Sequence, residues 1–228
     1  MWPLSDITVY YYGTKIKDTP EDWTFRKALN YISDYYHNSL DGYKPPKTGR
    51  ICITINDELT TSEPDYFGSI CIVYTTMDEE KYLELDKVEQ YKYLLDLIHD
   101  VIIRTVNQLN WDKAIFKSAY QKVKNSNFQF EKSYDKKKSR DRKKIATVVL
   151  RKTEDRAVIK VKIETNESVN EVIIVDKRNW YWFDSSYKIA KACKWIDKDK
   201  FGYAPKNSDK YVFYSLEKKE IETNMHFD

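Results

Sequence analysis

The spacing of the apolar residues changes along the chain, and this change limits the fold more than any other feature. From about residue 78 to residue 109, apolar side chains recur every three or four positions, which predicts one long amphipathic helix. From residue 145 to residue 164 they alternate with a period of two, which predicts two antiparallel strands. Because the helical and extended patterns occupy different parts of the chain, the sequence predicts an α+β protein.

Shorter segments complete this pattern. Further strands are predicted at residues 7–12, 50–56, 66–76, 171–175 and 211–216, and further helices at 20–36, 110–123 and 184–196. The runs at 50–56 and 66–76 are almost continuously apolar and are separated by a turn-forming segment, so we expect a hairpin of largely buried strands with a bulge at Gly68. The expected order is β-α-β-β-α-α and then β-β-β-α-β, with antiparallel sheets backed by helices.

A basic segment separates the two patterns. Residues 132–144 contain eight Lys or Arg and two Asp, a net charge of +6, whereas the whole chain carries +3. The segment has no apolar periodicity, so we expect an exposed and mobile connector. The predicted organisation is an N-terminal lobe at residues 1–130, a basic connector at 131–144 and a C-terminal lobe at 145–228.

Composition excludes several classes of protein. Of the 228 residues, 41% are hydrophobic and 33% are charged, which is typical of a globular chain and not of a disordered one. No apolar run approaches the ~20 residues of a membrane span, and the first residues lack a signal-peptide pattern, so we expect a cytoplasmic protein without membrane contact. The three cysteines lie in apolar surroundings, which predicts reduced and buried thiols.

The residue types that most often carry catalysis or bind metals are few and scattered. His37, His99 and His226 lie at a helix end, within a helix and near the C-terminus, and we interpret the mid-helix His99 as structural. With five glycines and three cysteines, the chain offers neither a glycine-rich phosphate loop nor a metal-ligand spacing. We therefore expect no metal, no cofactor and no catalytic residues, and we interpret the chain as a non-enzyme.

Two acidic segments contain the residue types of a restriction-type nuclease. Asp65 is followed later by Glu79, Glu80 and Lys81. That catalytic arrangement needs the second acid and the lysine on a strand in the core of a sheet. In this sequence the second group begins a predicted helix, where acids are favoured by the helix dipole alone, so we do not interpret these residues as a nuclease site.

The basic segment supports an alternative function in nucleic-acid binding. Its candidate phosphate contacts are Lys136, Lys137, Lys138, Arg140 and Arg142. Two aspartates interrupt the run, and no helix-turn-helix or RNA-binding motif accompanies it. A solvated segment is the simpler interpretation.

Aromatic residues supply the main functional hypothesis. The chain has 19 Tyr and 6 Trp, and many of its rings lie after residue 179. Trp and Tyr anchor protein interfaces because they bury a large area and keep a polar group at the edge of the ring. We therefore predict binding to another protein through Trp180, Trp182, Tyr187 and Tyr203, with core packing of these rings as the alternative. An intracellular inhibitor or immunity protein, which covers a toxin or enzyme, would act in this way.

Overall fold

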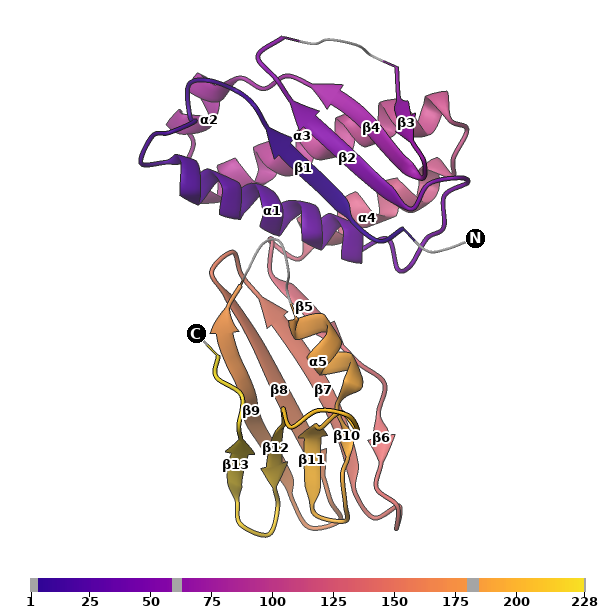
Figure 1. Ribbon diagram of the computed structural model, residues 1–228, viewed down its shortest axis with the longest axis vertical. Helices are drawn as coiled ribbons and strands as arrows, with labels where there is room; N and C mark the ends of the chain where they lie inside the picture. The colour runs from indigo at the N-terminus through magenta and orange to yellow at the C-terminus, as the bar shows by residue number, and fades with distance from the viewer. Residues whose placement is uncertain (1–3, 59–62, 180–184, 228) are drawn as a thin grey trace. The chain divides into compact units, whose positions relative to one another are not determined.

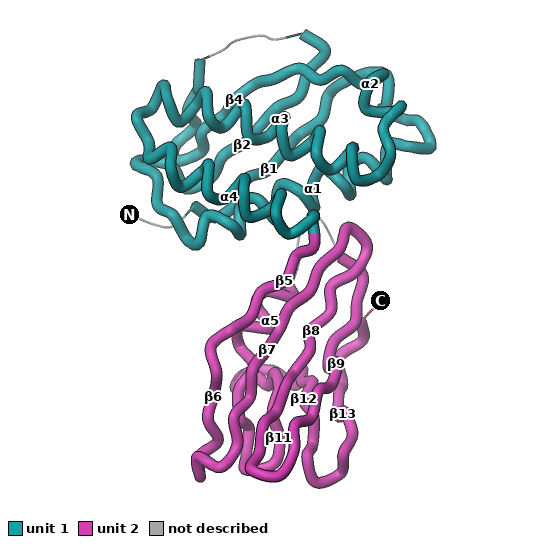
Figure 2. Tube along the Cα trace, turned by 180° about the vertical axis from the view of Figure 1, so that it is seen from behind, with its two compact units in different colours: residues 1–128 teal, residues 129–228 magenta. Residues whose placement is uncertain are grey.

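The chain divides into two compact units. The computed structural model describes residues 4–58, 63–179 and 185–227. The first unit is Met1–Phe128 and the second is Gln129–Asp228, and Figure 2 colours them separately. Both units combine helix and strand, which confirms the expected α+β class. No described helix is both long enough and apolar enough to cross a lipid bilayer.

The first unit contains one four-stranded mixed sheet and four helices. Its elements are β1 (Ile7–Tyr11), α1 (Asp22–Asn38), β2 (Arg50–Ile55), β3 (Asp65–Phe67), β4 (Ile70–Thr75), α2 (Glu79–Glu84), α3 (Lys87–Gln108) and α4 (Lys113–Asn125). The strands lie in the order β1-β2-β4-β3, with β1, β2 and β4 parallel and β3 antiparallel to β4. The hairpin predicted between residues 50–56 and 66–76 is wrong, because β2 and β4 run in parallel. The tight turn lies instead between β3 and β4 at Gly68, whose φ of +60° suits glycine.

The long helix predicted at residues 78–109 is two helices, α2 and α3, which are separated at Leu85 and Asp86. The side chain of Asp86 accepts a hydrogen bond from the backbone N of Glu89 at 2.9 Å and caps α3. Leu85 and Val88 continue the helical spacing across the break. Because the apolar spacing is continuous, the sequence pattern did not reveal that Asp86 begins a new helix.

The core of the first unit lies between the sheet and one layer of helices. Figure 1 shows α1, α3 and α4 on the same side of the sheet. Ile51, Ile53 and Ile55 of β2 point toward this layer and are at most 1% exposed. Tyr11 of β1 packs edge-to-face on Phe25 of α1, with ring centroids 4.7 Å apart. The helices thus cover one face of the sheet.

The second unit is built from two antiparallel sheets and one short helix. Its elements are β5 (Phe130–Ser133), β6 (Lys137–Lys138), β7 (Ile145–Lys152), β8 (Arg156–Glu164), β9 (Val169–Arg178), α5 (Ser186–Ala192), β10 (Lys194–Trp195), β11 (Lys200–Tyr203), β12 (Val212–Ser215) and β13 (Glu220–Thr223). One sheet has the order β5-β7-β8-β9, with β6 also paired to β7, and the other has the order β10-β11-β12-β13. In Figure 1 the smaller sheet and α5 lie against one face of the larger sheet. The period-two alternation of residues 145–164 is confirmed, since Ala146, Val148 and Leu150 are buried.

The basic segment is part of the second unit and does not connect two lobes. Residues 130–133 and 137–138 pair with β7 as the edge strands β5 and β6. The ammonium group of Lys137 donates to the carbonyl oxygens of Lys191 and Cys193, at the end of α5. The connector predicted at residues 131–144 is therefore corrected, because backbone pairing and a lysine contact hold much of it to the sheet.

Candidate functional site

Among the described residues of the first unit, the helices lie over one face of the sheet and none lies over the other. In β4 the side chains alternate between half-buried and buried along the strand, and β2 follows nearly the same pattern. Figure 1 is viewed toward the uncovered face, with the helix layer behind it. We name this surface the open sheet face. It consists of Thr8, Tyr10, Tyr12, Arg50, Cys52, Thr54, Asp65, Phe67, Ile70, Ile72 and Tyr74.

Strand register places these side chains in rows across the sheet. Tyr10 lies beside Thr54, which lies beside Tyr74. In the next row Cys52 lies beside Ile72. Tyr12 and Phe67 border the face and are 62% and 76% exposed. Rings and branched aliphatic groups thus form a continuous surface, because neighbouring side chains on one face of a sheet touch each other.

The centre of the open sheet face carries no charged group. The ion pair between Arg50 and Asp6, 2.9 Å apart, lies at one end, and Asp65 of the border strand β3 lies directly opposite Ile72. Burial raises the pKa of the Tyr10 hydroxyl and also raises that of the Cys52 thiol. Both groups are therefore neutral at pH 7, and the charges remain at the rim.

The outer face of the larger sheet in the second unit provides a comparison within the same molecule. Four ion pairs cross or flank this face, namely Arg151–Glu131 at 2.6 Å, Arg156–Asp176 at 2.5 Å, Lys162–Glu164 at 3.0 Å and Lys160–Glu171. Alternating charges of this kind are typical of a sheet face that remains in water. The open sheet face has no such arrangement.

The strand sequences of the first unit have the pattern of a sheet that is covered on both faces. The sequences ICITI in β2 and ICIVYT in β4 are almost continuously apolar. Parallel strands with this pattern are normally covered on both faces. We predicted largely buried strands from the same pattern, and the structure confirms this prediction: four of the six residues of β2 and three of the six residues of β4 are buried, and the others are half-buried. The sequence contains a signal for the open sheet face, because the predicted helices of the first unit follow strands that have the pattern of a sheet covered on both faces.

Two of the four predicted aromatic anchors, Tyr187 and Tyr203, are among the described residues. Trp180 and Trp182 lie outside those residues. Tyr187 is half-buried in α5, where its ring packs on Phe130 at 5.8 Å and lies 4.4 Å from the ammonium group of Lys152. Tyr203 is half-buried at the end of β11. Neighbouring rings in the smaller sheet, Phe201, Phe213 and Tyr214, are buried.

The predicted nucleic-acid contacts are only partly available. Lys136, Lys138, Arg140 and Arg142 are exposed, whereas the ammonium group of Lys137 is bonded to two backbone carbonyls. Four of the five predicted phosphate contacts are therefore exposed, and the ammonium group of the fifth is already hydrogen-bonded within the protein. The prediction that Lys137 contacts phosphate is therefore corrected. Lys137 instead holds β6 against the end of α5.

The acids that have the residue types of a nuclease are used in structural contacts. The buried carboxylate of Glu79 accepts hydrogen bonds from the Tyr11 hydroxyl at 2.5 Å and from the backbone N of Ile16 at 2.8 Å. Glu80 pairs with Lys15 at 2.6 Å. Both acids fix the segment that follows β1. Among the residues that the structure describes, no group of His, Cys, Asp and Glu is arranged to hold a metal ion.

His99 belongs to a polar network within the helix layer. Its Nδ1 lies 2.8 Å from the Tyr36 hydroxyl, and that hydroxyl lies 3.2 Å from the carbonyl oxygen of Phe116. Tyr120 stacks on the imidazole at 4.3 Å and donates a hydrogen bond to Asp96 at 2.6 Å. Burial, the largest effect, lowers the pKa of His99. The network joins α1, α3 and α4, which supports the structural interpretation of His99.

Comparisons with protein-family models, with curated proteins and with solved structures found no match to this chain.

Proposed function

We propose that the chain is a non-enzymatic protein-binding module and that the open sheet face of the first unit is its binding surface. The observation that carries this proposal is that strands with the sequence of a doubly covered sheet have a helix layer on one face alone. A partner protein would provide the second layer. This proposal keeps the predicted class of function and places the surface in the first unit instead of the C-terminal aromatic region.

The chemistry of the open sheet face suits such contact. Interfaces are depleted of charge at their centre and enriched in tyrosine and large aliphatic residues, with polar groups at the rim. Tyr10 and Tyr74 provide rings with hydroxyl groups, and Ile72 provides a central aliphatic contact. Arg50 and Asp6 are placed to act at the rim. An inhibitor or immunity protein that covers a toxin or enzyme is one form of this function, because covering a partner requires a matching surface and no reactive group.

A charge at the centre of the open sheet face tests the proposal. Cross-linking of the purified protein in native lysate, followed by mass spectrometry, identifies the partner, and calorimetry then measures its affinity. We expect Ile72→Lys to weaken binding by ~2 kcal/mol or more, because an ammonium group would be desolvated in the interface.

Ile173→Lys is the matched control, since Ile173 is 48% exposed on β9 in the other unit. This variant should bind as the wild type does. Unchanged affinity of correctly folded Ile72→Lys and Thr54→Lys variants would refute the open sheet face as the binding surface. Thermal melting of each variant separates loss of binding from loss of folding.

A further inference from the structure

The second unit contains a cavity of about 480 Å³ at the end of its two sheets. Three connections line it, namely those between β6 and β7, between β8 and β9, and between β12 and β13. Tyr214 and Leu216 contribute apolar surface from β12 and the residue after it. The volume lies within the ~300–1,000 Å³ that is typical of small-molecule sites.

Hydrogen bonds within two of the connections, and one to the turn before β11, order parts of the cavity lining. Asp141 accepts a hydrogen bond from the Ser139 hydroxyl at 2.6 Å. The Thr165 hydroxyl oxygen accepts from the backbone N of Ser168 at 3.0 Å. Lys144 donates to the carbonyl oxygen of Lys198 at 2.8 Å, which ties its segment to the turn before β11. These parts of the lining are thus held in place by the chain before any ligand binds.

The cavity lining carries charges of both signs, namely the carboxylates of Asp141 and Glu167 and the ammonium groups of Lys143, Lys144 and Lys219. Lys144 is neutralised by Asp199 at 3.1 Å, and the Ser139 hydroxyl, the largest effect, lowers the pKa of Asp141. Lys143 and Lys219 line the cavity from two different connections, and neither forms an ion pair in the described structure. Lys143 also contributes to the lowered pKa of Asp141, so it is shared with that carboxylate, whereas Lys219 is available to a phosphate or carboxylate on a ligand.

The remaining lining groups suit hydroxyl groups on the same ligand. Asn166, Glu167 and Asn170 line the β8–β9 side of the cavity and offer carboxylate or amide oxygen atoms as acceptors. A simple inorganic anion would leave these acceptors unused. We infer that this cavity binds a small polyhydroxylated ligand that carries an oxyanion, such as a sugar phosphate. The site lies in the second unit and does not depend on the proposed protein-binding surface in the first.

Titration of the full chain with ribose 5-phosphate, ribose and inorganic phosphate tests this inference. We expect ribose 5-phosphate to bind more tightly than either ribose or inorganic phosphate, since it alone uses both sets of groups. Lys143→Ala combined with Lys219→Gly should weaken binding of ribose 5-phosphate by about tenfold or more. Glycine is chosen at position 219 because the backbone there has a φ of +57°.

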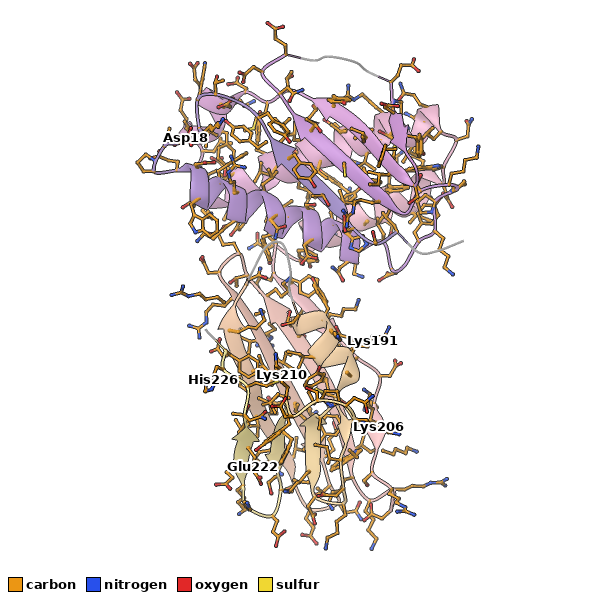
Figure 3. The ribbon with its side chains drawn as sticks, viewed as in Figure 1. Asp18, Lys191, Lys206, Lys210, Glu222 and His226 are labelled. Atoms are coloured by element: carbon orange, nitrogen blue, oxygen red, sulfur yellow. The ribbon has the colours of Figure 1, made fainter. Side chains whose placement is uncertain are left out.

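Two further variants make the test specific. Glu167→Gln should lower the affinity for ribose 5-phosphate but not for inorganic phosphate. Lys206→Ala combined with Lys210→Ala removes the same charge from the segment before β12, at the end of that strand opposite the β12–β13 turn, and should leave binding unchanged (Figure 3).

Three results would overturn the inference. They are no binding of ribose 5-phosphate at millimolar concentration, equal affinity for ribose, and undiminished affinity in the Lys143 and Lys219 double variant. A fourth result would favour a nucleic-acid surface over the cavity. It is a single-stranded oligonucleotide that binds more tightly than ribose 5-phosphate and binds more weakly to the Lys136→Ala and Lys138→Ala variants.

Discussion

At the scale of single residues, His99 shows how the surroundings of a side chain decide its role. The sequence predicts a structural histidine from its place within a helix, and the contacts with Tyr36 and Tyr120 support that interpretation. Its partners come from α1 and α4, distant in sequence, so no local pattern could have identified them. The same limit applies to Lys137, which resembles any other lysine of the basic run until β6 is paired.

The surroundings of His99 predict how the stability of the protein depends on pH. Burial lowers its pKa in the folded state below the ordinary 6.5, although Asp96 and Asp100 oppose the shift. The folded state therefore binds fewer protons than the unfolded state. This contribution to stability is complete above pH 6.5 and is lost as the pH falls through the folded pKa. Urea denaturation from pH 7.5 to pH 5 should show decreasing stability, and the His99→Gln variant should show a smaller decrease over the same range. Equal slopes for both proteins would contradict this account.

At the scale of elements, the sequence predicted most helices and strands but not which strands pair. Apolar runs at residues 50–56 and 66–76 indicate strands, yet their spacing contains no information about parallel or antiparallel partners. The pairing depends on α1, which connects β1 to β2, and on the short β3, which returns the chain to the start of β4. The break before α3 was hidden because a capping aspartate stood inside a continuous apolar stripe.

The edge strand β6 allows a test with adjacent lysines. Lys137 donates to two carbonyls near the C-terminal end of α5, and its own carbonyl oxygen accepts from Trp195 Nε1 at 2.9 Å. Lys138 is exposed. We expect Lys137→Ala to lower the free energy of unfolding by ~1.5–3 kcal/mol, the usual range for hydrogen bonds to charged groups, and Lys138→Ala to change it by less than ~0.5 kcal/mol. Chemical denaturation measures both values. Similar changes in the free energy of unfolding for the two variants would instead indicate that Lys137 is solvated like Lys138.

At the scale of the whole molecule, the sequence predicted two parts and ended the first at residue 130, close to Phe128, but began the second at residue 145. The change of apolar period begins at residue 145, whereas the second unit begins at Gln129, because its edge strands are polar and basic. Edge strands with many lysines lack the alternation by which buried strands are recognised, and their charge discourages pairing with other chains. Sequence patterns identify the centre of this sheet better than its border.

The boundary can be tested with two fragments. The fragment 129–228 keeps β5 and β6, and we expect a cooperative thermal transition and dispersed NMR signals. The fragment 145–228 lacks both strands and exposes the edge of β7, so it should melt at a lower temperature or fail to fold. Equal melting temperatures would show that residues 129–144 add nothing to the second unit.

The open sheet face also has a consequence for the cell that makes this chain. A bare, charge-poor sheet surface attracts other exposed apolar surfaces, its own copies included, whenever its proper partner is scarce. Selection against aggregation and selection for tight binding therefore act on the same few side chains in opposite directions. A lysine at position 72 would therefore improve solubility and remove the proposed function together.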